Sequence, residues 1–232
     1  MIPVIALLLI AAPHPVRAEL VEAPDPGAAR ATRPSTGSGR TAERDDTPID
    51  AERAFAADAK ALGQWTAFRK WSTDDAVMFV PQPVNAQAFL KDRKDPPKVI
   101  DWWPTASWIS CDGGVAVNTG EWKRPDGSVG YFTTVWQRQV DGGWKWILDH
   151  GDTLKSLRPS ITEPVVRRAG CNVPKFNRTT DPAGLKSGNA PDNSLGWSWS
   201  VKADGSREVA VMMWSGKRFE NVLNNQVAAP SK

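Results

Sequence analysis

The sequence is poor in histidine, cysteine and tyrosine, with 2 His, 2 Cys and 1 Tyr among 232 residues. So few His argue against a His-rich metal site, and two Cys permit only one intrachain disulfide. No apolar run reaches the roughly 18 residues that a membrane-spanning helix needs. The net charge of +3 is too small to indicate nucleic-acid binding. We therefore expect a globular protein that uses no metal, cofactor or nucleic acid.

Tryptophan, in contrast, is abundant, with 12 residues in the chain, and nine of them lie within residues 43–152. The same stretch carries 13 Lys and Arg against 17 Asp and Glu, whereas residues 153–232 carry 12 against 6. The small overall charge therefore combines an acidic, Trp-rich part of net charge −4 with a basic, turn-rich tail of net charge +6.

The first 46 residues are predicted to lie outside the fold. Residues 1–18 contain an apolar run of signal-peptide length and small residues near its end, although no Lys or Arg precedes that run. A short buried helix is the alternative. Residues 19–46 are rich in Pro, Ala, Gly, Ser and Thr and are expected to be a disordered linker. The mature protein is thus expected to be periplasmic or secreted, without membrane insertion.

Helices are predicted to come first in residues 47–152. Thr47 can cap a helix and Pro48 suits its first position, and Gly63 is expected to end it. A second short helix follows, and Asn85 can cap a third over residues 86–91. Residues 76–80 are a strand candidate. The spacing that indicates the first two helices is carried by Ala51, Phe55, Ala59 and Leu62, then by Trp65, Phe68 and Trp71.

From residue 106 the apolar period changes to two, which is typical of strands. Four strand-like runs cover residues 106–111, 115–123, 129–140 and 144–149. The turns between them, at 112–114, 125–127 and 141–143, contain Asp and Gly, which tolerate the backbone of tight hairpins. Helices followed by consecutive hairpins predict an α+β domain, with an antiparallel sheet packed on the N-terminal helices.

Several segments resemble, in order, the SnoaL-like domains of the nuclear-transport-factor-2-like superfamily, in particular small domains of unknown function in secreted bacterial proteins. They are DDAV at 74–77, NTGEW at 118–122, YFTTVWQRQ at 131–139 and DGGWKWILDHG at 141–151. The resemblance covers about residues 48–152 and implies a cone-shaped, strongly bent sheet with a pocket at its wide end. The superfamily includes isomerases, cyclases, dehydratases and non-catalytic binding or dimerisation modules, so the fold does not settle the function.

Candidate chemical groups gather near the end of the last strand. A ketosteroid isomerase needs an Asp base together with a Tyr and a protonated Asp, and the single Tyr131 lies on a predicted strand, so that triad does not map onto this chain. Asp149 and His150 remain weak candidates for a general base, with Tyr131 a further one. Because neighbouring strand residues point to opposite faces, at most one of Asp149 and His150 faces a pocket unless a bulge intervenes. Both could equally be structural.

The aromatic residues could line a pocket for an apolar or aromatic molecule, or fill the core or a dimer interface. The first hypothesis is therefore a binding domain for a small apolar molecule, and a homodimer is expected. The second is a lyase or isomerase with a pocket carboxylate or His150 as base. The third is a dimeric module whose cone is filled by its own side chains. The pocket candidates are Trp65, Phe68, Trp71, Trp102, Trp103, Trp122, Trp136 and Trp146.

The tail, residues 153–232, is predicted to be an extension of the core domain at 47–152. In an exported protein Cys111 and Cys171 are expected to form a disulfide, with two separate buried thiols as the alternative. Residues 174–194 are expected to form a long loop. A β-hairpin over residues 196–214 is expected to pack on the core, since an isolated hairpin is marginally stable. Contact of the basic tail with anionic surfaces is a rival interpretation.

Overall fold

The computed structural model describes residues 47–175 and 183–230. The predicted signal peptide and linker lie outside these residues. The described chain has three helices and eleven strands, in which the helices come first, as the sequence predicts. In chain order they are α1 (Pro48–Leu62), α2 (Gln64–Trp71), β1 (Ser72–Phe79), β2 (Pro83–Asn85), α3 (Ala86–Leu90), β3 (Asp101–Ile109), β4 (Val115–Lys123), β5 (Val129–Arg138), β6 (Trp144–Leu154), β7 (Val165–Arg168), β8 (Leu185–Asn189), β9 (Leu195–Val201), β10 (Arg207–Trp214) and β11 (Phe219–Val227).

The helices begin and end where the local chemistry predicts. The Thr47 side chain accepts a hydrogen bond from the Asp50 backbone N–H, which caps α1, and Pro48 occupies the first turn. Gly63 ends α1 at a positive φ of 106°, a conformation that suits Gly, and α2 starts directly after it. The Asn85 side chain caps α3 by accepting from the Ala88 N–H at 2.8 Å.

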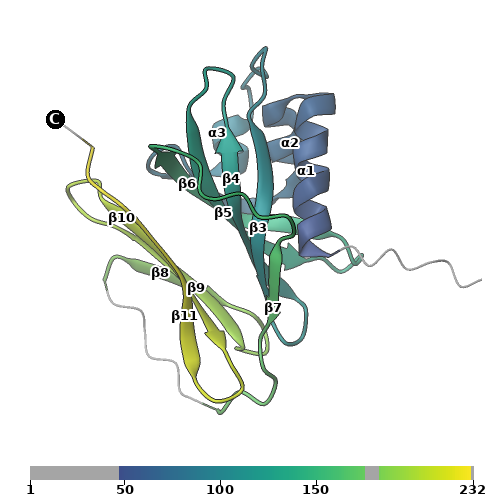
Figure 1. Ribbon diagram of the computed structural model, residues 1–232, viewed down its shortest axis with the longest axis vertical. Helices are drawn as coiled ribbons and strands as arrows, with labels where there is room; N and C mark the ends of the chain where they lie inside the picture. The colour runs from purple at the N-terminus through teal and green to yellow at the C-terminus, as the bar shows by residue number, and fades with distance from the viewer. Residues whose placement is uncertain (1–46, 176–182, 231–232) are drawn as a thin grey trace, which may run out of the picture. The chain divides into compact units, whose positions relative to one another are not determined.

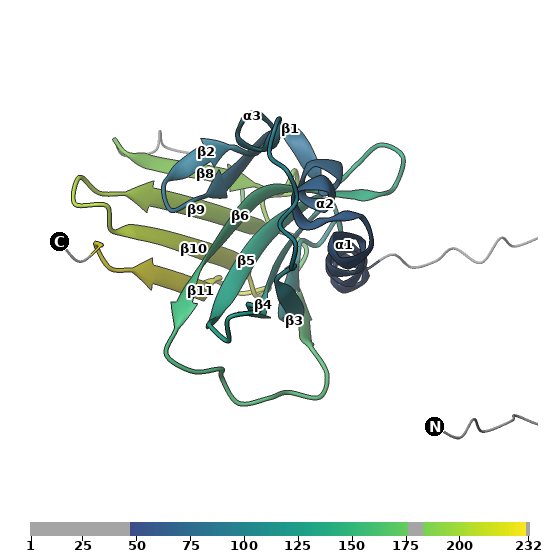
Figure 2. The same cartoon turned by 90° about the horizontal axis from the view of Figure 1, so that it is seen from above.

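Seven strands form the main sheet, in the order β2-β1-β6-β5-β4-β3-β7. Strands β3, β4, β5 and β6 pair in sequence as antiparallel hairpins, as expected. Two further pairs are parallel: β1 with β6, and β7 with β3. Figures 1 and 2 show α1 and α2 lying against one face of this curved sheet. The predicted α+β class, with helices on a bent sheet, is confirmed.

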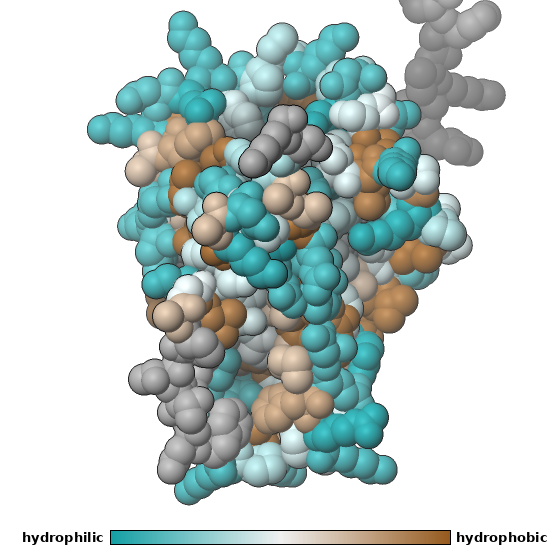
Figure 3. All heavy atoms as spheres, turned by 90° about the vertical axis from the view of Figure 1, so that its left-hand side faces the viewer, coloured by the Kyte–Doolittle hydropathy of each residue, from teal (hydrophilic) through white to brown (hydrophobic). Residues whose placement is uncertain are grey.

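A second, four-stranded antiparallel sheet, in the order β11-β10-β9-β8, lies against the opposite face of the main sheet (Figure 1). Residues of both sheets share one apolar cluster, which includes Val117 and Val135 of the main sheet and Val211 and Met213 of β10. The predicted hairpin is therefore present as β9 and β10, and it packs face-on against the core. Figure 3 views the molecule from the side of this second sheet, where many hydrophilic side chains surround smaller hydrophobic patches.

The disulfide between Cys111 and Cys171 is confirmed, with a Cα–Cα distance of 5.4 Å. It joins the turn after β3 to the chain that leads into the second sheet. Two hydrogen bonds support the same junction: the Cys111 backbone N–H donates to Ser194 Oγ at 2.8 Å, and the Gly170 N–H donates to the Trp214 carbonyl at 2.7 Å. The tail is thus fastened to the core at several points.

Several strand assignments differ from the prediction. β1 begins at Ser72, four residues before the predicted strand at 76–80, and β8 lies inside the stretch expected as a long loop. The first hairpin strand begins at Asp101 rather than at residue 106. β2, β7 and β11 were not predicted. β7 is an edge strand that is exposed along its whole length. Its sequence, VVRR, therefore lacks the alternation of apolar and polar residues that predicts a half-buried strand.

Candidate functional site

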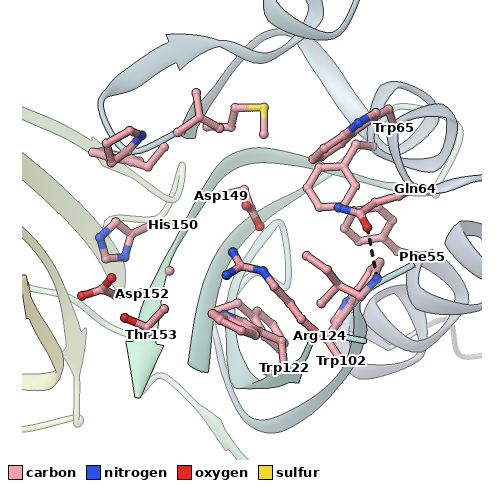
Figure 4. A pocket seen from close by; sticks show the side chains of 18 of the residues that line it. Phe55, Gln64, Trp65, Trp102, Trp122, Arg124, Asp149, His150, Asp152 and Thr153 are labelled. Carbon is pink, nitrogen blue, oxygen red and sulfur yellow. Dashed lines mark hydrogen bonds between the residues drawn. The ribbon is translucent and has the colours of Figure 1, made fainter. Parts of the chain in front are cut away.

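A cavity of about 370 Å³ lies between the helices and the main sheet. Its walls come from α1 and α2 on one side and from the concave face of β3 to β6 on the other, and it continues around the end of β1 toward β10. Figure 4 shows Asp149 on one side of β6, facing Arg124 and Trp122, with His150 and Asp152 on the other side of that strand. The cavity therefore has an inner, aromatic part and an outer, polar part.

The inner part is walled by aromatic rings that hold one another in place. Phe55 of α1 makes edge contacts with Phe68 and with Trp102, at centroid distances of 4.8 and 4.9 Å. Trp65 adds a further edge contact to Phe68 at 5.6 Å. These contacts fix the orientation of side chains that come from both helices and from β3, so this wall of the cavity is apolar and well packed.

Trp122 of β4 forms the opposite wall, and its position depends on a glycine. A Cβ atom on Gly130 would lie 2.1 Å from the Trp122 ring, so only glycine lets the indole lie flat on β5. The Trp122 Nε1–H donates to the Tyr131 carbonyl at 3.0 Å. The guanidinium of Arg124 lies 4.4 Å from the Trp122 ring centroid and places a positive charge at the cavity wall.

Glu52 of α1 is a buried carboxylate beside the aromatic wall, with a relative exposure of 0%. It accepts hydrogen bonds from Trp102 Nε1 at 3.0 Å, from Trp136 Nε1 at 2.7 Å and from Asn118 Nδ2 at 3.2 Å. Burial raises the Glu52 pKa from 4.5 to about 7, and the three donors oppose that rise. Because every donor is a buried side chain, Glu52 ties α1 to three strands of the main sheet.

Asp149 of β6 lies at the wall of the cavity, which Glu52 and Asp152 also border. Its carboxylate accepts a hydrogen bond from Thr134 Oγ1 at 3.1 Å. Burial, assisted by the charge of Glu52, raises the Asp149 pKa from 3.8 to about 7. A carboxyl group of this pKa is present in both its acid and its base forms near neutral pH, so it can either donate or accept a proton.

His150, the next residue, points to the other face of the sheet and lies at the outer part of the cavity. Its Nε2 accepts a hydrogen bond from Arg207 Nε of β10 at 3.2 Å. Burial and the Arg207 charge lower the His150 pKa from 6.5 to about 3. Because Nε2 is occupied and the ring stays neutral, His150 is poorly suited to act as a general base, and Asp149 is the better candidate.

The structure brings four of the eight predicted aromatic candidates to the cavity: Trp65, Phe68, Trp102 and Trp122. The other four do not line it. Trp71 and Trp103 border separate surface depressions, and Trp136 and Trp146 are fully buried in the core.

Of the three weak catalytic candidates, Asp149 and His150 border the cavity and Tyr131 does not. Tyr131 lies under the Arg158 guanidinium, at 5.1 Å from its ring centroid, and burial raises its pKa to about 12.

Three residues of the site were not anticipated from the sequence: Glu52, Arg124 and Arg207. A signal existed for Glu52, which shares the helical stripe of Pro48, Phe55 and Ala59 and is therefore an acid on an apolar face. No local pattern marks Arg207, because only the packing of the second sheet brings it to His150. Among the described residues, no group of three or more His, Cys, Asp or Glu is arranged to hold a metal ion.

No family model matches the sequence, and no curated protein matches it either. Solved structures with a similar arrangement exist. A proposed ketosteroid isomerase from Parabacteroides distasonis is 21% identical, with a TM-score of 0.38 over 46% of this chain and 85% of that chain. ActVI-ORFA from Streptomyces coelicolor is 16% identical, with a TM-score of 0.35 over 45% and 92%. A nuclear transport factor 2-like superfamily protein from Salmonella enterica is 13% identical, with a TM-score of 0.35 over 50% and 92%. At these values the likeness says nothing about the activity of this chain.

Within residues 47–175 and 183–230, the structure contains no helix that is long and apolar enough to cross a membrane.

Proposed function

We propose that this protein binds a small, largely apolar or aromatic molecule in the cavity between α1, α2 and the main sheet. The observation that carries the proposal is a cavity of about 370 Å³ whose inner part is walled by aromatic rings, with Asp149 at its wall and few other polar side chains around it. Ligand sites of about 300–1,000 Å³ with mostly apolar walls and few polar groups are typical of small-molecule binding. The open cavity also disfavours the hypothesis of a cone filled by its own side chains.

Binding can be tested with 2-acetylnaphthalene as a probe, followed by quenching of tryptophan fluorescence. Trp122→Ala removes one wall of the cavity and is expected to weaken probe binding at least tenfold. Trp103→Ala is the matched control, because Trp103 borders a different surface depression, and it is expected to leave the affinity unchanged. Saturable quenching that is identical in both variants would place the probe elsewhere and contradict the proposal. Native mass spectrometry of protein from its natural host would then identify a retained ligand.

As a second candidate, we propose proton transfer by Asp149. Its position at the cavity and its pKa of about 7 favour this function. The Asp149 carboxylate would remove a proton from the carbon next to a ligand carbonyl and return a proton from solvent. The test is exchange of the methyl protons of 2-acetylnaphthalene in D₂O, followed by proton NMR. Asp149→Asn should abolish catalysed exchange while probe binding persists, and equal exchange rates would rule this activity out.

We propose further that residues 1–18 direct export to the periplasm or the medium. The Cys111–Cys171 disulfide supports this, because disulfides persist in oxidising compartments. N-terminal sequencing of protein recovered from an extracytoplasmic fraction should show that residues 1–18 have been removed. An uncleaved N-terminus would contradict export by this signal.

A homodimer, and the division of the chain at residue 152, stay predictions. The apolar face of the main sheet is covered by the second sheet of the same chain, so a dimer would have to use another surface, such as the exposed edge strand β7. Sedimentation equilibrium measures the oligomeric state directly.

A further inference from the structure

His150 and Arg207 form a polar pair at the outer part of the cavity, where the second sheet meets the main sheet. The His150 ring is 1% exposed, and the Phe79 ring lies against it at a centroid distance of 5.0 Å. Arg207 donates to the imidazole through Nε and to the Gly151 carbonyl through Nη2, at 3.2 and 3.1 Å. Both His150 and Arg207 border the cavity.

This contact fixes which nitrogen of the imidazole carries the proton. An arginine guanidinium is always a donor and never an acceptor. His150 Nε2 must therefore be the accepting, unprotonated nitrogen, and in the neutral ring the proton lies on Nδ1. The lowered pKa of His150 is consistent with a ring that stays neutral throughout the physiological range.

The Nδ1–H group is left without an acceptor. Among the described residues, His150 Nδ1 is a buried polar atom with no hydrogen-bond partner. Buried donors are almost always paired, because an unpaired one loses its water without compensation. An unpaired donor at the border of a cavity is the arrangement expected of a group that binds a ligand.

We propose that the outer part of the cavity binds an uncharged oxygen acceptor of the ligand, a carbonyl or ether oxygen, through the Nδ1–H of His150. Arg207 is the positioning residue, which β10 supplies to hold the imidazole in this tautomer. The inference rests on the proposed binding function and adds the polar group that the ligand carries.

The charges around the pair favour a neutral acceptor over an anion. Asp152 Oδ1 lies 3.9 Å from Arg207 Nη2, so its charge offsets that of the guanidinium. Tyr131 has a ring centroid 6.2 Å from the imidazole and stays neutral because its pKa is raised to about 12, and Arg158 lies on that ring at 5.1 Å. A carboxylate in this buried place would lose its hydration and would be repelled by Asp152, and both costs oppose its attraction to Arg207.

The tautomer can be measured without any ligand by long-range proton–nitrogen NMR of ¹⁵N-labelled protein. We expect His150 to carry its proton on Nδ1 and not to titrate between pH 5 and 8. Arg207→Met should remove the preference for the Nδ1-protonated tautomer, whereas Arg207→Lys, which keeps a donor, should retain it. Arg218→Met is the matched control, because the Arg218 side chain is 81% exposed. A proton on Nε2 of the wild-type protein, or titration near pH 6, would overturn the proposal.

Ligand preference is tested with three probes that share one ring system: 2-acetylnaphthalene, 2-ethylnaphthalene and 2-naphthoate. The ketone should bind roughly fivefold or more tightly than the ethyl compound, as expected for one added hydrogen bond, and also more tightly than the carboxylate. His150→Phe should abolish the preference for the ketone. If that variant does not fold, the NMR signal of His150 Nδ1 in the wild-type protein decides the same point. The ketone should shift this signal, and the ethyl compound should not.

The outcomes separate the two proposals. Equal binding of the ketone and the ethyl compound would overturn the acceptor site and leave the binding function intact. Tighter binding of the carboxylate would also overturn it. Binding of none of the three probes would contradict both proposals together.

Discussion

Asp149→Asn should stabilise the protein at high pH, because the wild-type fold keeps this carboxyl group in surroundings that disfavour its charge. The Asp149 pKa is raised from 3.8 to about 7 by burial and by the charge of Glu52. Below about pH 4 the group is protonated in both the folded and the unfolded protein, and it imposes no penalty. As the pH rises from 4 to 7, the unfolded chain releases this proton before the folded chain does. The free energy of unfolding therefore falls over that range and levels off above pH 7.

The size of the effect follows from the pKa values. One pH unit is worth about 1.4 kcal/mol, so a rise from 3.8 to about 7 corresponds to about 4 kcal/mol at pH 8. Because Asp149 borders a cavity that water can enter, this figure is an upper limit.

The measurement is urea unfolding at pH 4, 5.5, 7 and 8.5, followed by tryptophan fluorescence. The difference between Asp149→Asn and wild type should be near zero at pH 4 and should reach about 2–4 kcal/mol in favour of the variant at pH 8.5. Asp74→Asn, at an exposed carboxylate, is the control and should show no such trend. A variant that is no more stable than wild type at pH 8.5 would refute a buried acid with a raised pKa.

Four further predictions concern the parts of the fold that support the site. Replacing Cys111 and Cys171 with Ser removes a cross-link between residues 60 positions apart, and urea unfolding should show a loss of about 4 kcal/mol. Glu52→Ala leaves two buried indole N–H groups without their acceptor, and the same assay should show a loss of about 3 kcal/mol or more. Gly130→Ala would drive a methyl group into the Trp122 ring, costing about 1–3 kcal/mol and changing the near-ultraviolet circular dichroism. A chain that ends after Leu154 would expose the face now covered by the second sheet, and light scattering should show self-association; a monomeric, folded truncation would contradict that role.

The elements that the sequence predicts well are those specified by local chemistry. The helix caps at Thr47 and Asn85 and the stop at Gly63 need only neighbouring residues, and the structure has them where they are expected. The hairpin turns of the main sheet place Gly113, Gly127 and Gly142 at positive φ, as their Asp-Gly pattern predicts. Local hydrogen bonding decides these points, so a single sequence contains the necessary information.

The elements that were missed depend on partners distant in the chain. β7 and β11 become strands because they pair with β3 and β10, and no alternation of apolar residues marks β7 beforehand. The site shows the same limit. A strand pattern places Asp149 and His150 on opposite faces of the sheet, and the structure agrees, yet both border one cavity because it continues past the end of β1.

Both faces of the main sheet are buried, and each face packs against a different layer of the protein. The face toward α1 and α2 carries the Trp-rich cluster and the cavity, whereas the face toward β10 carries Val117, Val135 and their partners. β4 and β5 are accordingly buried at nearly every position and do not alternate between buried and exposed residues. The second sheet is therefore more than a cover for apolar residues. Because Arg207 contacts His150 where the two sheets meet, the second sheet also completes the outer, polar part of a cavity whose aromatic part lies on the opposite face of the main sheet.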